Sequence, residues 1–255
     1  MTQLSKMDKD KFGPKVIDYG KPGTGKTAFW MTLGSSCLYL DCDRGFRTGL
    51  TMQDEWTTER GKVELIECWE TNPRQATAFS KTESAIQDAA NKSATGKFPY
   101  QVMVVDSFSA LAENCMRHVL QANGKLGKQP ELQHWSVMYN LLAGVLNNIR
   151  SMSETVVMPM HQEIHEVDGV NIIELFVPGK KLINRITPYF DEIVHSRIKN
   201  GAAGKVKYVL IGRGTHALPV RSRSNIPPEY DKSGGAKEYL KLMGYAIDKT
   251  EEGDK

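Results

Sequence analysis

A segment near the start of the chain combines glycines, a lysine and a threonine in a spacing suited to binding phosphate. It consists of Gly20, Lys21, Pro22, Gly23, Thr24, Gly25, Lys26 and Thr27 and leads into Ala28. Glycines at these positions let the backbone turn around an anion and point successive N–H groups toward it. Lys26 would reach the β- and γ-phosphates, and the Thr27 hydroxyl would coordinate Mg²⁺. The motif predicts a site for ATP and Mg²⁺ built from these residues.

The segments around this loop are those that the motif requires. Residues 16–19 predict a strand and residues 26–33 predict the helix after the loop. Residues 101–107 contain the most strand-like run in the chain, which ends in Asp106. A carboxylate at that strand end is suited to hold Mg²⁺, directly or through water. The structural alternative is that Asp106 only caps the following helix.

Two further acids follow another apolar run, residues 36–40. Alternation along a strand places Asp41 and Asp43 on the same face. Asp43 lies further past the strand end and is the candidate to orient water on the γ-phosphate. Asp41 is expected to bond nearby backbone or the Mg²⁺ shell, and a purely structural role for Asp43 is the alternative.

A third pair of polar residues, His161 and Gln162, ends the apolar strand predicted over residues 155–160. Either side chain could sense the γ-phosphate through a hydrogen bond that changes on hydrolysis. The alternative is a metal site, because His161 and His165 are four residues apart. The string His-Gln-Glu-Ile-His differs from the zincin order H-E-x-x-H, however, and disfavours zinc.

A basic window between residues 193 and 224 contains no acid and ends in Arg221 and Arg223. An arginine supplied by a neighbouring subunit can stabilise transition-state charge on the γ-phosphate, and this pair is the candidate. A solvated basic turn, or phosphate contacts to nucleic acid, is the alternative.

The order of the segments predicts an α/β fold with a mostly parallel central sheet, flanking helices and an antiparallel C-terminal extension of the sheet. Asp168-Gly169 predicts a hairpin turn within residues 164–176. Two further strands are predicted around residues 190–198 and 205–211. Helices are predicted over residues 73–93, 109–120 and 132–152, with a short one near residues 237–242. We expect a flexible leader over residues 1–14, one domain over residues 15–228 and a partly flexible tail over residues 229–255.

The composition of the 255 residues is that of an ordinary globular protein, with 40% hydrophobic and 25% charged residues. A net charge of +3 does not by itself require a polyanionic partner. Cys37, Cys42, Cys68 and Cys115 form no C-x-x-C pair, which predicts reduced, mostly buried thiols. The chain lacks a membrane-length apolar run and begins without a hydrophobic signal core, so we expect a cytoplasmic protein with no membrane association.

Together these segments resemble the RecA-like P-loop ATPase core, and more closely the short phage RecA-like recombinases that act with single-strand annealing, described as phage nucleotide-binding or AAA-type proteins. The resemblance covers roughly residues 15–228. It depends on residues 20–27, 38–43, 102–107, the Gln-Pro segment ending at Trp135, and residues 160–162, 178–191 and 221–223.

This resemblance implies an oligomeric ATPase, ring or filament, in which Asp43 activates water and His161 or Gln162 senses the γ-phosphate. It implies two loops, at about residues 121–133 and 163–181, that line a path for single-stranded DNA. The basic residues available for DNA contact are Lys125, Lys128, Lys180, Lys181 and Arg185. A single-strand DNA-binding or annealing protein would be a further partner, in the host cytoplasm if the chain is phage-encoded.

The favoured hypothesis is therefore a Mg²⁺-dependent, DNA-stimulated ATPase that oligomerises on single-stranded DNA in recombination and repair. One alternative is a small-molecule phosphotransferase such as a nucleotide kinase, which needs an arginine-bearing lid over the phosphates. The second alternative is a P-loop nucleotide switch that does not act on DNA and does not hydrolyse ATP.

Overall fold

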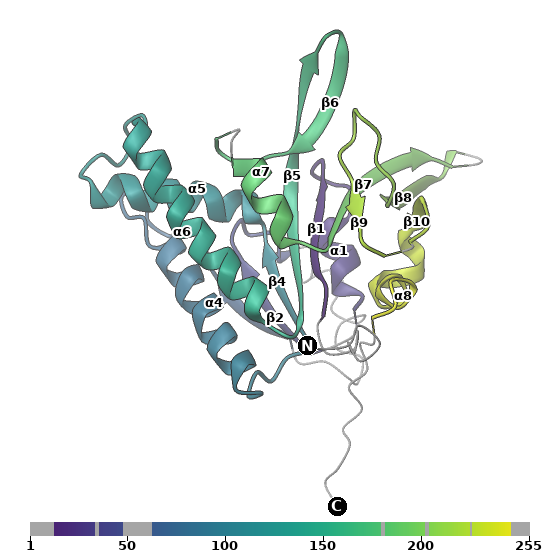
Figure 1. The fold of residues 1–255 in the computed structure, drawn as a ribbon, viewed down its shortest axis with the longest axis horizontal. Coiled ribbons are helices and arrows are strands. Elements are labelled where there is room, and N and C mark those ends of the chain that lie inside the picture. The colour runs from purple at the N-terminus through teal and green to yellow at the C-terminus, as the bar shows by residue number, and fades with distance from the viewer. Residues whose placement is uncertain are drawn as a thin grey trace, which may run out of the picture.

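A computed structural model describes residues 13–33, 36–47, 63–179, 182–201, 204–224 and 226–245 (Figure 1). Its helices are α1 (Lys26–Met31), α4 (Ala78–Ala94), α5 (Phe108–Ala122), α6 (Leu132–Ser151), α7 (Ile183–Ile186), η4 (Thr187–Tyr189), η6 (Lys232–Gly234) and α8 (Gly235–Leu242). Its strands are β1 (Lys15–Gly20), β2 (Cys37–Asp41), β3 (Val63–Glu67), β4 (Val102–Asp106), β5 (Thr155–Val167), β6 (Val170–Leu175), β7 (Glu192–Asn200), β8 (Val206–Ile211), β9 (Arg221–Ser222) and β10 (Glu229–Asp231).

The main sheet has the strand order β10-β8-β7-β1-β5-β4-β2-β3. The strands from β7 to β3 are parallel, while β8 and β10 extend the sheet in antiparallel pairing. This arrangement confirms the predicted mixed α/β fold with a mostly parallel central sheet and an antiparallel extension. Because parallel strands run in one direction, the residues that follow β1, β2 and β4 emerge at the same edge of the sheet.

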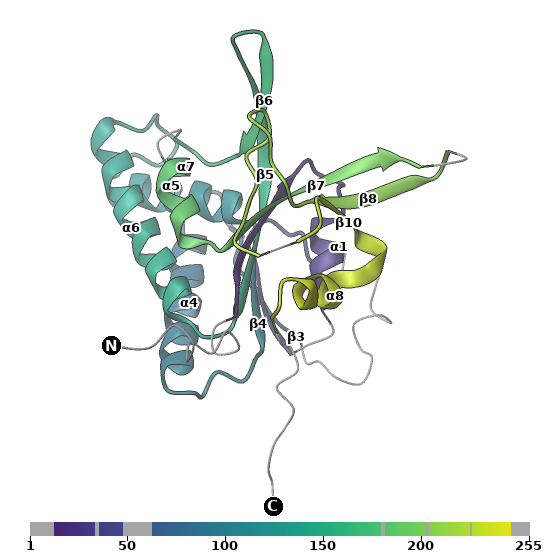
Figure 2. The same cartoon turned by 45° about the vertical axis from the view of Figure 1, so that its right-hand side comes forward.

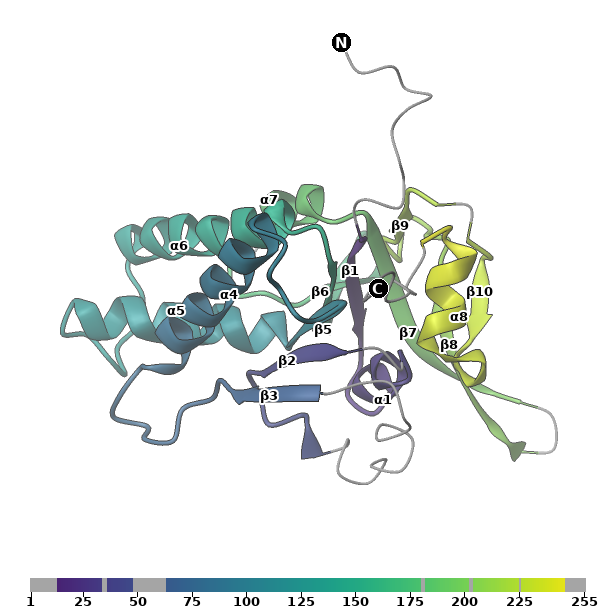
Figure 3. The ribbon, with the colours of Figure 1, turned by 90° about the horizontal axis from the view of Figure 1, so that it is seen from below.

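Helices cover both faces of the sheet (Figure 3). Helices α4, α5 and α6 pack on one face and share a buried cluster with Ile17 and Tyr19 of β1. Helices α1 and α8 pack on the other face, in a cluster with Val16. The side chains of β1 therefore alternate between two apolar layers, as expected for a central strand that is buried on both faces. Among the described helices, none is both long and apolar enough to cross a membrane.

Strand β5 continues beyond the sheet and forms a projecting hairpin with β6 (Figures 1 and 2). The turn residues Asp168 and Gly169 have positive φ angles of 51° and 77°. These angles suit a two-residue turn between twisted antiparallel strands, and the predicted hairpin is confirmed. The sequence predicted one strand over residues 155–160 and another at the start of the hairpin. The structure has the single strand β5 there, because its pairing passes from β1 in the main sheet to β6.

Two predicted boundaries differ from the structure. Helix α4 begins at Ala78, five residues after the predicted start at residue 73, because Glu70 accepts the Ala78 N–H at 2.9 Å and the Thr77 hydroxyl at 3.2 Å. The C-terminal stretch also continues the domain beyond residue 228. Strand β10 pairs with β8, and α8 buries Tyr239 and Leu240.

Candidate active site

The predicted phosphate-binding loop connects β1 to α1 at the carboxyl edge of the sheet. Gly25 has a φ of +72°, a conformation that side chains rarely adopt. Residue 20 has room only for glycine, because a Cβ there would lie 2.5 Å from the Ser196 carbonyl oxygen. The Lys26 ammonium donates to the carbonyl oxygens of Gly20 and Lys21, each at 2.9 Å. The loop is therefore folded around its lysine.

Thr27 and Asp106 meet directly although they lie on different elements. The Thr27 hydroxyl donates to the Asp106 carboxylate at 2.7 Å, and the Tyr39 hydroxyl of β2 donates to the same oxygen. Burial, reinforced by the charge of Asp43, raises the pKa of Asp106 to about 6. A hydroxyl and a carboxylate in contact at a strand end are a suitable ligand pair for Mg²⁺.

Asp43 lies beside this pair and contacts two other elements. Its carboxylate accepts the Ser107 hydroxyl at 2.9 Å and lies 3.5 Å from His161 Nε2. Burial opposes ionisation of Asp43, but hydrogen bonds from His161 and Ser107 outweigh it and hold its pKa below the usual value. Asp43 is thus an ionised acid at the edge of the cavity, as a group that orients water must be.

Asp41 has a different environment from Asp43. Its two carboxylate oxygens accept the backbone N–H groups of Gly45 at 2.9 Å and Phe46 at 3.2 Å. Burial raises its pKa, although these two hydrogen bonds act in the opposite direction. Asp41 therefore holds the turn after β2, which is one of the two roles expected for it.

His161 and Gln162 point to different neighbours, because successive residues of a strand face opposite sides. His161 faces Asp43, whereas Gln162 Oε1 lies 3.0 Å from Nε2 of His195 on β7. Burial lowers the pKa of His195 to about 4, so this imidazole is neutral. Only His161 of the predicted pair lies at the cavity.

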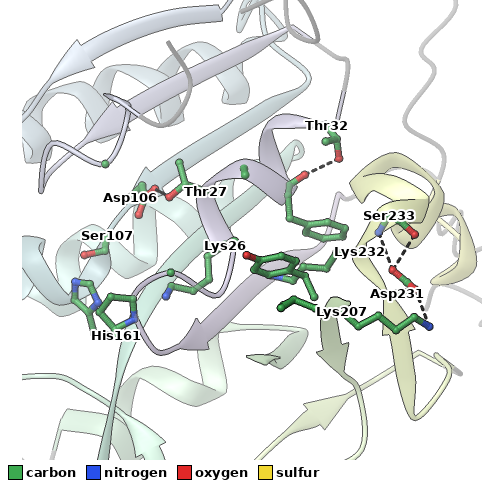
Figure 4. Close-up of a pocket in the computed structure, with 18 of the residues that line it drawn as sticks. Lys26, Thr27, Thr32, Asp106, Ser107, His161, Lys207, Asp231, Lys232 and Ser233 are labelled. Carbon is green, nitrogen blue, oxygen red and sulfur yellow. Dashed lines mark hydrogen bonds and ion pairs between the residues drawn. The ribbon is translucent and has the colours of Figure 1, made fainter. Parts of the chain in front are cut away.

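The cavity between these groups and the C-terminal strands has a volume of about 720 Å³. Figure 4 shows Asp106, Ser107 and His161 on one side, Asp231 and Ser233 on the other, and Lys26 and Lys232 between them. The ring of Tyr208 lies against Gly25, where an added Cβ would be 3.4 Å from the ring. The C-terminal wall consists of Val206, Lys207, Tyr208, Asp231, Lys232 and Ser233.

The structure does not bring Arg221 and Arg223 to this cavity. Arg221 pairs with Ile193 near the start of β7, whereas Gly20 pairs with Ser196 further along the same strand. The Arg221 guanidinium donates to the carbonyls of Thr187 and Phe190, and Arg223 pairs with Asp191 at 2.9 Å. Both arginines are engaged within their own chain, so their action on a neighbouring subunit stays a prediction.

The residues predicted to contact DNA are spread over two connections. Lys125 and Lys128 lie between α5 and α6, where Lys125 pairs with Glu131. Arg185 of α7 lies over the ring of Tyr139, 5.3 Å from its centroid. Lys180 and Lys181 lie outside the described residues.

The end of the second expected loop contacts α6 just beyond the first expected loop. Gly179 packs against α6, where a Cβ at residue 179 would lie 3.0 Å from the Trp135 ring. The end of the second expected loop therefore lies beside α6, which begins at Leu132 near the end of the first expected loop.

The zinc alternative at His161 and His165 is disfavoured by the strand. Residues four apart on a strand are separated by about 13 Å, whereas on a helix they would be neighbours. His165 instead lies 3.6 Å from Glu174 on the paired strand.

Sequence reasoning missed Tyr39, Tyr208, Asp231 and Lys232. Tyr39 is one more aromatic residue in an apolar strand, and nothing in its spacing distinguishes it from core. Tyr208 and Asp231 belong to antiparallel strands, and Lys232 directly follows the second of these strands. The sequence signal available for them was the pair Asp231-Lys232 at the end of a short strand.

Residues 13–224 match a protein-family model described as an AAA domain. Among solved structures, flagellar accessory protein FlaH from Methanocaldococcus jannaschii is similar, with 8% sequence identity and a TM-score of 0.40. The similarity covers 83% of this chain and 90% of that one. No curated protein gave a significant match.

Proposed function

Since the chain belongs to the AAA domain family and carries a P-loop ATPase core, we propose that it hydrolyses ATP with Mg²⁺ and acts as an oligomer on single-stranded DNA in recombination or repair. The observation that carries the ATPase half is the convergence of Lys26, Thr27, Asp43, Asp106 and His161 on one cavity. Lys26 and Thr27 begin α1, Asp43 follows β2, and Asp106 and His161 lie on β4 and β5.

The phosphate half of the cavity is suited to a triphosphate. Burial lowers the pKa of Lys26, but Asp18, Asp106 and Asp43 oppose this shift and favour the charged form. Its ammonium would exchange the carbonyls of Gly20 and Lys21 for phosphate oxygens. Thr27 and Asp106 would hold Mg²⁺, which would neutralise phosphate charge.

Hydrolysis needs a group that orients water, and Asp43 is the best placed of the acids. Its carboxylate is ionised, its side chain is 25% exposed, and it contacts His161 and Ser107. A contact between His161 and Asp43 would change when the γ-phosphate leaves, which gives His161 the sensor role.

The apolar half of the cavity would hold the nucleoside. Tyr208 lies over the loop at Gly25, and Phe29 and Thr32 line the floor beside α1. An aromatic ring beside the phosphate loop can stack on a purine. The polar side chains of Asp231 and Ser233 lie at the same wall and could bond the base edge.

The DNA half of the proposal is supported by the resemblance and by the packing of Gly179, near the end of the second expected loop, against Trp135 of α6. The phosphotransferase alternative is less well supported, because no arginine occurs among the described residues that line the cavity. A lid arginine is what that chemistry requires.

The test is ATP turnover by the full chain with and without single-stranded DNA, at two salt concentrations. We expect turnover that requires Mg²⁺, rises with DNA and is lost in Lys26→Ala. Turnover without any DNA stimulation or salt-sensitive DNA binding would remove the DNA half and leave the ATPase. Transfer of phosphate to a nucleoside monophosphate would instead support the phosphotransferase.

A further inference from the structure

The C-terminal segment returns to the edge of the sheet where the phosphate loop lies. Strand β10 is antiparallel to β8, β8 is antiparallel to β7, and β7 is parallel to β1. Strand β10 therefore runs in the same direction as β1, and its end delivers residues 231–233 beside the loop. This segment lies beyond residue 224, where the match to the family model ends.

Lys232 is the residue of this segment whose side chain contacts the backbone of the phosphate loop. Its side chain is 5% exposed, and its ammonium donates to the Thr24 carbonyl at 3.1 Å and the Ser196 hydroxyl at 2.6 Å. The ammonium also lies 3.9 Å from the Asp18 carboxylate and 5.3 Å from the centre of the Phe29 ring. One buried cation thus joins the loop, β7, β1 and α1.

Asp18 explains why a cation is required at this place. It is fully buried on β1 and accepts hydrogen bonds from Trp30 Nε1 at 2.9 Å and from the Ser196 hydroxyl. A buried carboxylate is costly unless charge and hydrogen bonds compensate it. Burial lowers the pKa of Lys232 to about 8, while Asp18 acts to raise it.

The hydrogen bond from Lys232 to the Thr24 carbonyl orients a peptide of the loop, which the ion pair with Asp18 does not do. A planar trans peptide points its C=O and its N–H in opposite directions. Holding the Thr24 carbonyl toward Lys232 therefore turns the Gly25 N–H, which belongs to the same peptide, away from Lys232. In a glycine-rich loop before a helix, such N–H groups are the ones that bind phosphate.

We propose that Lys232 is a positioning residue that preorganises the phosphate loop for ATP by holding the Thr24 carbonyl. This role rests on the proposed ATP binding and adds a dependence on the C-terminal segment. It acts on nucleotide affinity, because Lys232 contacts neither Asp43 nor Thr27, and those residues carry the chemistry.

The test compares ATP affinity and turnover at saturating ATP for four variants of the full chain. Lys232→Met removes the charge, and Lys232→Arg keeps it. The control Lys199→Met removes an exposed lysine that pairs with Glu229 outside the cavity. We expect about tenfold weaker ATP binding for Lys232→Met with turnover changed less than about threefold, because lost binding with unchanged kcat indicates lost positioning before the chemical step. Lys232→Arg should recover part of the affinity, and Lys199→Met should match the wild type.

The fourth variant separates positioning from stability. Lys232→Met leaves Asp18 unpaired and lowers the melting temperature, whereas the double variant Asp18→Asn/Lys232→Met removes both charges and recovers it. We expect the double variant to remain weak in ATP binding. Recovery of ATP affinity together with stability would overturn the positioning role. Failure of the wild-type chain to bind ATP would instead overturn the proposed function.

Discussion

The cavity edge of the sheet and the projecting β5–β6 hairpin share strand β5 but differ in how their side chains are held. At the cavity, Asp106 and Asp43 each contact two or more side chains from other elements. On the hairpin, Ile164, Val167 and Val170 are 48%, 44% and 47% exposed. A site for a small ligand is preorganised by its own contacts, whereas a surface for a large partner is completed by that partner. Substitutions should therefore have large effects at the cavity and small ones on the surfaces assigned to DNA.

The largest effect is expected for Lys26→Ala. Loss of the cation that faces the phosphates should lower turnover by about 100- to 1000-fold, as for removal of one preorganised transition-state donor. Lys199→Ala is the control, because this lysine pairs with Glu229 outside the cavity. Steady-state ATPase assays check both, and equal losses in the two variants would mean that the loop does not hold phosphate as proposed.

Asp106→Asn should lower ATP turnover but raise the free energy of unfolding. Turnover should fall by about 100-fold because Mg²⁺ loses a ligand. The free energy of unfolding at pH 7 should rise by about 1–3 kcal/mol, since the folded-state pKa of about 6 lies above that of an unfolded Asp.

The stability gain has a defined pH window. The folded state binds the extra proton, so the wild type loses this stability as pH rises from about 4 to about 6, and the variant does not. Urea unfolding without Mg²⁺ at about pH 5 and pH 7 measures the difference. An equal gain at both values would argue against ionisation of Asp106 as its cause.

A smaller effect is expected for His161→Ala, which removes the group that faces Asp43. A hydrogen bond to a charged partner of this kind is worth about 10- to 100-fold in rate if it acts in the transition state. Gln162→Ala should change turnover by less than about threefold, because its partner is His195. The reverse order would assign the sensor role to Gln162.

The smallest effects are expected at the residues proposed to contact DNA. Arg185→Ala and Lys128→Ala should each weaken single-stranded DNA binding about 2- to 10-fold. Where a phosphate contact is lost, the slope of log binding constant against log salt concentration should decrease in magnitude by about one. Lys92→Ala on α4 is the control, because this exposed lysine pairs only with Asp88 among the described residues. Fluorescence anisotropy over a salt series checks this, and identical slopes in all three variants would exclude these contacts.

The sequence predicted the cavity residues that follow apolar strands, because an acid after a buried run must lie at the edge of the sheet. This reasoning located Asp43 and Asp106. It could not choose between His161 and Gln162, since adjacent strand residues face opposite sides and only the order of neighbouring strands decides which side holds the loop. Lys232 was missed for another reason. It follows a short strand in a stretch of mixed charge, and its position depends on two antiparallel returns of the chain.

The most direct test of the account is ATP binding and turnover by Asp43→Asn in the presence of Mg²⁺. Asp43 is proposed to orient water, whereas Lys26 and Thr27 are proposed to hold the nucleotide. The variant should bind ATP within about threefold of the wild type and hydrolyse it about 100- to 10,000-fold more slowly, as for loss of a general base. Turnover equal to that of the wild type would contradict the account. So would weaker ATP binding together with unchanged turnover at saturating ATP.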